Sequence, residues 1–413
     1  MLEALPSRLL LLASLSLVPV LAAAQGGKGG KKGAEEAPKE GEEAAVALQL
    51  PPTPKAIDET IKKNVELAKK ESVKLGEKLG GDFGVAFGTV LKVRAEGNSN
   101  ERVQELVRAG DTMVEVLAEE FGVDKVKDLW AGSRGPFNMY YFKSKSTFGD
   151  ALREVLEKEY PRHALNTDSK TLLDIGRFIR ETPSPLTGGF FENEAHEYHL
   201  AHMLGQTFVF YLTRGGPPFK SAPATTGEGA SEIEKIDPKV EMELMQQEDN
   251  SWLNEGAALY SSVRFCGANH TYCVTNAKYV GNIAIADKDV DTAYRLVCYE
   301  MAMGDEKSKD FKTLSRTETN SLDYLDLAKA WSFYDWMTQA EMRPKLVALL
   351  KGMRGRSFGT SLKQNLGWSF DDLEEKWKAF AKDEYGPKKK KKADDKSKGG
   401  KPAGPQKKDP KSK

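Results

Sequence analysis

Apolar residues recur at helical or strand spacing through most of the chain between residues 56 and 385. This region begins near Ala56 with a charged helical segment. Residues 90–94 and 137–142 form short runs of β-branched, aliphatic and aromatic residues, which predicts two strands. Between them, apolar residues at helical spacing predict a helix that Asn98 caps and Gly122 ends. These apolar positions are Val103, Leu106, Val107, Val114, Leu117 and Phe121.

The pattern then turns increasingly helical toward the end of the chain. We expect a helix over residues 147–159, a short strand over 188–191 and a long helix over 192–212. A second helical segment covers 251–262, and further helices run from 322 to 385 with buried faces that carry several tryptophans. The pattern therefore predicts an α+β fold, mostly helical, with a small β-sheet preceding the helix that carries three of the five histidines.

The first 25 residues resemble an export signal. A short head with Arg8 precedes an apolar stretch from Leu9 to Leu21, and three alanines ending at Ala24 follow it. This order is typical of a secretory signal peptide, which we expect to span residues 1–24. The alternative is an N-terminal anchor helix, for which about 13 apolar residues fall short of the roughly 20 that a membrane span needs. We therefore expect an exported protein, periplasmic or extracellular, without an integral membrane span in the mature chain.

Composition divides the rest of the chain into three parts. Residues 25–54, rich in Gly, Lys, Glu and Pro, are expected to form a disordered linker, and residues 55–386 the folded domain. In residues 387–413, twelve Lys against three Asp give a net charge of +9, while the whole chain sums to zero. Apart from proline, this tail has no apolar side chain larger than alanine, which predicts a disordered Lys-rich tail. Its charge would suit attachment to an anionic envelope polymer, and the alternative is a solubilising tail with no specific partner.

The chain has three cysteines, few for a protein held together by disulfides. Cys266 and Cys273 would close a short loop, so they are the expected pair if an oxidising compartment forms one bridge. Cys298 would then be left over. The alternative is three reduced, buried thiols, and the sequence does not decide between them.

One short segment carries a specific resemblance. Trp252-Leu253-Asn254-Glu255-Gly256 lies 53 residues after His202, counted to Glu255. It resembles the context in which peptidase-MA-like domains, a gluzincin-type family of zinc metallopeptidases, carry their third zinc ligand. The order of predicted elements over roughly residues 85–385 is similar to that family as well. The resemblance implies a gluzincin-like fold, with Glu255 as a zinc ligand.

The expected HExxH motif of that family is degenerate. Residues 196–202 read His-Glu-Tyr-His-Leu-Ala-His, and no register of this segment gives HExxH. If His202 is the second histidine, Tyr198 stands at the first ligand position and His199 replaces the catalytic glutamate. We favour this register because the apolar residues that follow His202 fit the family's helix better.

The second register begins the motif at His196 and Glu197, and it puts Leu200 where the second histidine belongs. In a helix, His196, His199 and His202 would follow one another at about 60° and span an arc of about 120°. Two of them, either His199 and His202 or His196 and His202, could then share a zinc ion with Glu255.

In either register the candidate catalytic base, Glu197, points to the side of the histidine arc. The interpretation without metal is a hydrogen-bonded polar cluster that descends from an active site. Zinc is the only cofactor that the resemblance implies.

The leading functional hypothesis is an exported metallopeptidase-like domain that is catalytically impaired and binds peptide or envelope material in the former substrate cleft. One alternative is an active zinc-dependent peptidase with a non-standard His/His/Glu site. Another is a surface-attached structural protein that acts through its basic tail. The expected partners are a peptide or protein ligand and an anionic polymer, and a nucleic-acid partner is not expected. GxxxxGK does not occur in the sequence, so nucleotide hydrolysis has no local signal.

Overall fold

A computed structural model describes residues 46–123, 137–152, 177–180, 186–190, 196–214, 237–269 and 290–387 of the chain. The expected signal peptide and the lysines from residue 388 onward lie outside the described residues, as does most of the expected linker. Residues 46–54, at the end of that linker, pack against the body of the protein.

Five strands form one small sheet in the order β1-β2-β3-β5-β4. The central pairs β2–β3 and β3–β5 are parallel, and the outer pairs β1–β2 and β4–β5 are antiparallel. The strands are β1 (Phe83–Phe87), β2 (Leu91–Glu96), β3 (Phe137–Phe142), β4 (Arg177–Arg180) and β5 (Leu186–Phe190). The expected strands near residues 90, 137 and 188 are confirmed as β2, β3 and β5.

Helices make up most of the remaining described chain. Those before and around the sheet are α1 (Lys55–Lys63), α2 (Val65–Leu79), α3 (Asn100–Glu120) and α5 (Lys145–Ala151). Those that follow are α8 (His196–Arg214), α9 (Pro238–Gln247), α10 (Ser251–Cys266), α11 (Val290–Met303), α12 (Phe311–Leu314), α13 (Tyr324–Met337), α14 (Arg343–Gly352), α15 (Phe358–Leu366) and α16 (Phe370–Tyr385). The fold is therefore α+β, mostly helical, with one small sheet that precedes the histidine-bearing helix α8.

Helix α3 begins one residue later than the capping pattern predicted. The hydroxyl of Ser99 accepts the backbone N–H of Arg102 at 3.2 Å and is the N-cap. The side chain of Asn98 instead donates to the Glu96 carbonyl at the end of β2. The prediction that Asn98 caps α3 is wrong because its side chain bonds within the turn that leads out of β2. The Ser99 hydroxyl lies within reach of the first N–H groups of the helix instead.

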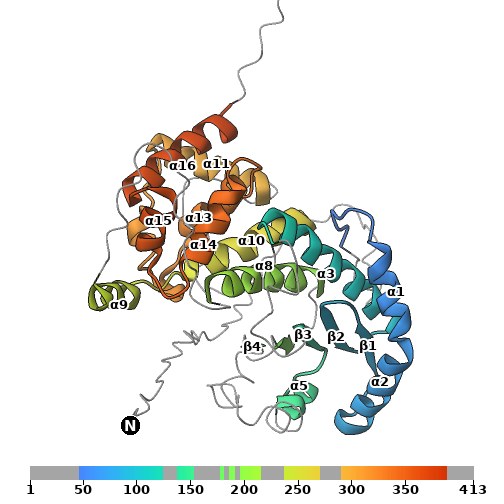
Figure 1. The fold of residues 1–413 in the computed structure, drawn as a ribbon. Helices are drawn as coiled ribbons and strands as arrows, with labels where there is room; N and C mark the ends of the chain where they lie inside the picture. Colours follow the sequence, from blue (N-terminus) through green and yellow to red (C-terminus); the bar gives the residue numbers. More distant parts are fainter. Residues whose placement is uncertain are drawn as a thin grey trace, which may run out of the picture.

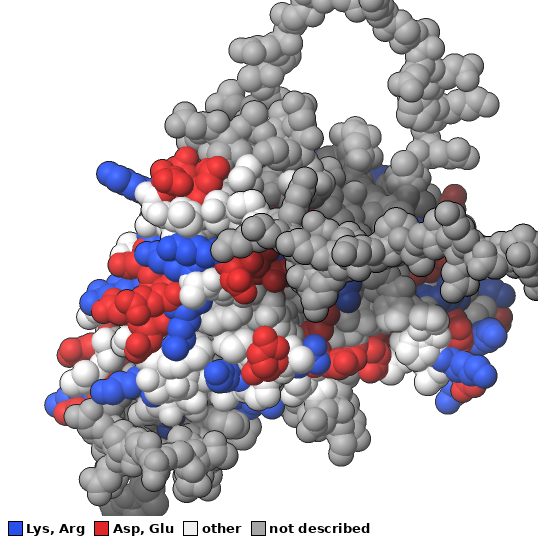
Figure 2. All heavy atoms as spheres, turned by 90° about the horizontal axis from the view of Figure 1, so that it is seen from above, with Lys and Arg blue, Asp and Glu red and all other residues white. Residues whose placement is uncertain are grey.

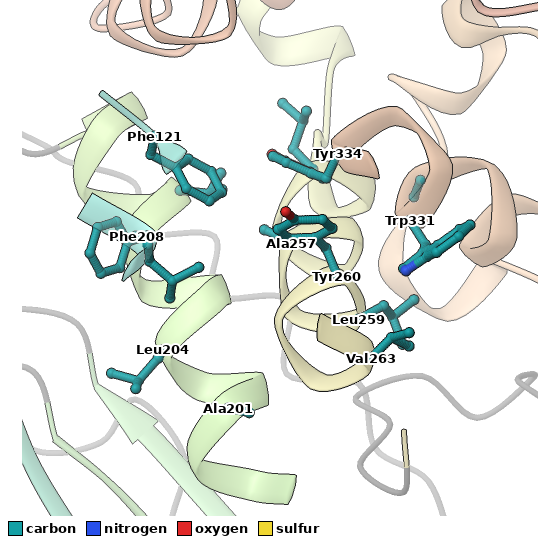
Figure 3. Packing of buried hydrophobic residues seen from close by; sticks show 14 of the residues in the cluster. Phe121, Ala201, Leu204, Phe208, Ala257, Leu259, Tyr260, Val263, Trp331 and Tyr334 are labelled. Atoms are coloured by element: carbon teal, nitrogen blue, oxygen red, sulfur yellow. The ribbon is translucent and has the colours of Figure 1, made fainter. Parts of the chain in front are cut away.

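The protein has the sheet at one end, with α1 and α2 on its outer side, and the helices α11 and α13–α16 at the other end (Figure 1). Helices α8 and α10 lie between these two parts, and α10 packs against both α8 and α13. Leu204 and Phe208 of α8, Tyr260 of α10 and Tyr334 of α13 fill this region (Figure 3). The main hydrophobic core therefore fixes the positions of α8 and α10 relative to each other.

Acidic and basic side chains are interspersed on the described part of the surface that Figure 2 shows. Among the described residues, no helix combines the length and the apolar character that crossing a membrane requires.

Candidate functional site

Helix α10 carries the Trp-Leu-Asn-Glu-Gly segment, and its first turn is anchored in the core. Asn250 precedes the helix in a left-handed conformation with φ 58°, which asparagine tolerates better than most residues. Trp252 is fully buried, with ring centroids 5.2–5.4 Å from those of Phe311, Phe333 and Phe358. The tryptophan therefore fixes the start of α10. It thereby also sets the position of Glu255, which lies about one helical turn later.

Two glycines allow α10 to approach its neighbours closely. A Cβ added at Gly256 would lie 2.6 Å from the carbonyl oxygen of Ala330 on α13, and one at Gly205 of α8 would lie 2.3 Å from that of Ala257. Real Cβ atoms do not come so close to backbone oxygens, so glycine is needed at both crossings. Gly256 therefore lets α10 lie close to α13, and Gly205, three residues after His202, lets α8 lie close to α10.

His202 and Glu255 face each other across the contact between α8 and α10. The Nε2 atom of His202 lies 3.9 Å from a carboxylate oxygen of Glu255, and both side chains are buried. The side-chain amide of Gln206, one turn further along α8, donates to the other Glu255 oxygen at 3.4 Å. Of the predicted ligands, the structure therefore brings His202 and Glu255 together.

The other two histidines of α8 turn toward the sheet. The ring of His196 lies 4.3 Å from that of Tyr141 on β3, and the ring of His199 lies 5.5 Å from it, measured between centroids. The Tyr141 hydroxyl is also 3.4 Å from Nδ1 of His199, a long hydrogen bond. The arc of histidines expected from helical geometry is thus divided between a strand on one side and α10 on the other.

Glu197 forms an ion pair with a residue that the sequence analysis did not single out. The guanidinium of Arg102, in the first turn of α3, lies 2.5 Å from Oε1 of Glu197. The Glu197 side chain is 3% exposed, whereas that of Arg102 is 25% exposed. The second oxygen, Oε2, is buried and has no hydrogen-bond partner in the described structure. Arg102 therefore gives the buried side chain of Glu197 a charged partner from another helix.

Burial and nearby charges shape the protonation of this cluster. The pKa of His196 is lowered to about 4, first by burial and then by the positive charges of Arg102 and Lys143. The pKa of Tyr141 is raised well above its usual value by burial and by the carboxylate of Glu197. At neutral pH the cluster therefore holds a neutral imidazole at His196 and a neutral phenol at Tyr141.

The described cysteines are reduced and buried. Cys266 donates its thiol to the backbone carbonyl of Glu197 at 3.7 Å, and burial followed by the Glu197 charge raises its pKa to about 12. Cys298 donates to the carbonyl of Ala328 at 3.3 Å, and burial raises its pKa as well. Both are free thiols in the described structure. Cys273, the expected partner of Cys266, lies outside the described residues.

The donor groups do not form a three-ligand zinc site as they stand. Among the described residues, no three His, Cys, Asp or Glu side chains converge on a point where a metal ion could bind. His202 and Glu255 offer two donors that face each other, but His196 and His199 lie against Tyr141. A structural or catalytic zinc site usually takes three or four protein ligands, so a rearrangement of α8 would have to supply the third.

Arg102, Tyr141 and Gln206 belong to this cluster although no local pattern indicated them. Arg102 lies 95 residues before its partner Glu197, and Tyr141 lies 58 residues before His199. A contact of that sequence separation leaves no trace in periodicity or spacing. Gln206 had a weak signal, because it lies one helical turn after His202 and so on the same face of α8.

Comparison with known proteins does not identify the chain. No protein-family model matches its sequence, and no curated protein matches it either. The function is therefore argued from the residues and from the arrangement described above.

Proposed function

We propose that this chain is an exported peptide-binding protein, built on a gluzincin-like body that has lost peptide hydrolysis. The observation that carries the proposal is the ion pair between Arg102 and Glu197. A general base must be able to accept a proton from the attacking water, and it must reach that water directly. The partner that Glu197 has instead is the guanidinium of Arg102, which occupies Oε1 of the carboxylate.

The surroundings of Glu197 support the same conclusion. His199, which stands at the glutamate position in the favoured register of the motif, is engaged with the Tyr141 hydroxyl. In neither register of the motif, therefore, is the residue at the general-base position, His199 or Glu197, a carboxylate that is free to activate water. The cluster contains the residue types of a metallopeptidase site, but its side chains bond to one another and to neighbouring elements, as in a structural polar cluster.

The gluzincin-like assignment is supported by the relation between α8 and α10. The sheet precedes α8, the glutamate of the Trp-Leu-Asn-Glu-Gly segment faces α8 from α10, and it meets the histidine that the favoured register makes a ligand. This pairing lies at the close crossing of α8 and α10, where Gly205 packs against Ala257 and Ser261.

A peptide is the ligand class that the sheet favours. Strand β4 is the last in the strand order and runs antiparallel to β5, which ends six residues before α8 begins. An edge strand can bind an extended peptide through main-chain hydrogen bonds, with side-chain pockets adding specificity. The proposed ligand would extend the sheet at β4 and pass the N-terminal end of α8.

One distance favours the zinc-dependent alternative. The 3.9 Å between Nε2 of His202 and Oε2 of Glu255 is too long for a hydrogen bond. It is within the span of two ligands of one zinc ion, since each ligand atom lies about 2.0–2.2 Å from the metal. The alternative therefore predicts zinc bound by Glu255, His202 and either His199 or His196.

Both functions can be tested on the mature chain, residues 25–413, purified without a polyhistidine tag. Fluorescein-labelled random decapeptides are added and their anisotropy is followed, and hydrolysis is measured with and without equimolar zinc. The proposal predicts binding without cleavage. Unchanged anisotropy would contradict peptide binding, and cleavage that stops in Glu255→Gln would establish the zinc-dependent alternative.

Metal content separates the two further. The matched control is Glu120→Gln, because Glu120 is another largely buried glutamate, bonded to Tyr260 and Arg264 away from the histidines. Zinc near one equivalent in the unmodified chain and in Glu120→Gln, but absent from Glu255→Gln, would support the alternative. Zinc well below one equivalent in all three supports the proposal.

A further inference from the structure

Residues 46–51 lie on the body outside any helix or strand, and their side chains alternate in burial. Val46, Leu48 and Leu50 are half-buried and pack against the main core, whereas Ala47 and Gln49 are exposed. A repeat of two is the pattern of an extended peptide that lies with one side on an apolar surface. The segment therefore contacts the body as a bound peptide would.

A main-chain hydrogen bond fixes the segment to the end of α10. The backbone N–H of Gln49 donates to the carbonyl of Phe265 at 2.7 Å. The side chain of Gln49 passes over Gly267, where an added Cβ would lie 3.4 Å from its amide nitrogen. The carbonyl of Phe265 is in the last turn of α10, where helix carbonyls lack partners within the helix. The segment thus satisfies an acceptor that the helix end leaves open.

The segment continues onto α3 and borders an open hollow. The hydroxyl oxygens of Thr53 and of Thr112 on α3 lie 3.4 Å apart, and Arg108 of α3 holds α1 through Asp58 at 2.7 Å. Between Gln49 and Thr53, Pro51 lines a surface hollow of about 510 Å³. Its other walls are residues of the C-terminal half of α3 and the turn after it: Glu115, Val116, Ala118, Glu119, Gly122 and Val123.

We propose that the surface between the end of α10 and the C-terminal half of α3 is a binding groove for extended apolar peptides, occupied in cis by residues 46–51. The ligand class is a peptide with apolar side chains at alternate positions that donates a main-chain N–H to the Phe265 carbonyl. The hollow beside Pro51 has room for a larger side chain of such a peptide. The cis segment is thus an autoinhibitory strap.

The groove is close to the histidine cluster but separate from it. Cys266, next to Phe265, donates its thiol to the backbone carbonyl of Glu197, so both sites share the end of α10. Neither His202 nor Glu255 contributes to the groove. The inference therefore goes beyond the proposed function, and it stands whether or not the histidine site binds peptide.

The test uses a labelled synthetic peptide, Val-Ala-Leu-Gln-Leu-Pro-Pro, which copies residues 46–52, and the mature chain. In one variant of the chain, Leu48→Glu with Leu50→Glu displaces the strap and leaves the groove open. Ala47→Glu, at an exposed position of the same segment, is the matched control. Fluorescence anisotropy measures binding of the peptide, and of a control peptide that carries glutamate in place of both leucines.

The strap predicts that the double variant binds the peptide at least about tenfold more tightly than the unmodified chain and the Ala47→Glu chain. The glutamate-bearing peptide binds none of them. Equal affinity for all three chains, or no binding by a folded double variant, would overturn the inference. If the double variant does not fold, Gln49→Pro takes its place, because it removes only the N–H donated to Phe265 and leaves the apolar side chains.

Discussion

Arg102 and Glu197 lie 95 residues apart in the chain, and their side chains form an ion pair with 2.5 Å between nitrogen and oxygen. The pair connects the first turn of α3 with the first turn of α8. It also places a permanent positive charge beside the glutamate that a metallopeptidase would use as its base. The account of this protein as a binder, and not a hydrolase, depends on that contact.

Replacing Arg102 should destabilise the protein because it leaves a buried carboxylate without its partner. We expect Arg102→Met to lower the free energy of unfolding by about 1.5–3 kcal/mol, the range for hydrogen bonds to charged groups. Urea unfolding followed by circular dichroism measures this. The control is Arg108→Met on the same helix, whose pair with Asp58 is one-third exposed on both sides and should be worth less than about 1 kcal/mol. Equal effects of the two substitutions would contradict the assignment.

The helix crossing at Gly205 should not tolerate a methyl group. In Gly205→Ala the new Cβ would lie 2.3 Å from both the Ala257 carbonyl oxygen and the Ser261 hydroxyl oxygen, so α8 and α10 must separate. We expect a loss of about 1–3 kcal/mol or more in the free energy of unfolding, although alanine favours helices. Gln206→Ala, at the next position, should cost less than about 1 kcal/mol. A Gly205→Ala protein as stable as the parent would show that the helices are not closely packed here.

Asp111 should give stability a pH dependence. Its buried carboxylate accepts backbone N–H groups from Thr89 and Val90 in the turn before β2 and from Leu91, the first residue of β2, and burial raises its pKa to about 6. Because this value exceeds the unfolded pKa near 4, the contribution of Asp111 is full below about pH 4 and is lost as pH rises through about 6.

Asp111→Asn removes this titration. The stability of the parent relative to the variant should therefore fall by about 2–3 kcal/mol between pH 4 and pH 7. Chemical unfolding at several pH values measures the difference. A difference that is constant over this range, or that grows with pH, would show that the pKa is not raised.

Lys329 forms a buried ion pair that should be important for the helical end of the protein. Its ammonium lies 2.7 and 2.9 Å from the two carboxylate oxygens of Glu374 and 4.6 Å from the ring centroids of Phe311 and Trp377. Lys329→Met should cost about 3 kcal/mol because Glu374 keeps its charge, and adding Glu374→Leu should recover most of this.

Lys378 is the matched control for Lys329. It contacts the same carboxylate at 3.4 Å, but its side chain is 43% exposed. Lys378→Met should therefore change the free energy of unfolding by less than about 1 kcal/mol. If Lys329→Met and Lys378→Met lower the free energy of unfolding equally, burial of Lys329 is not what makes its ion pair strong.

The sequence predicted the elements with strong local patterns and missed those without them. The apolar run of residues 137–142 is strand β3 with identical bounds, and the helix after residue 251 follows from its apolar face. Strand β1 was missed because all of its residues, Phe83–Phe87, are buried, so apolar and polar residues do not alternate. Helices α9 and α11 were not predicted either. Local periodicity therefore predicts individual helices and strands more readily than it predicts how many of them the fold contains.

The candidate site was predicted in part, for a physical reason. The resemblance of residues 252–256 to a third-ligand segment predicted that Glu255 faces α8, and it does lie opposite His202. The division of the histidines between Tyr141 and α10 depends on how α8 is rotated against the sheet, which spacing alone does not determine. The Arg102 contact is set by the packing of α3 on α8, so only the folded chain brings these charges together.

Peptide hydrolysis by the mature chain in the presence of equimolar zinc tests the central claim most directly. Internally quenched random peptides report any cleavage, and the Arg102→Met variant is measured beside the parent to show whether releasing Glu197 matters. The account predicts no cleavage above the zinc-only blank by the parent chain. Zinc-dependent cleavage by the parent, abolished by Glu255→Gln or His202→Ala and retained in Glu120→Gln, would contradict it.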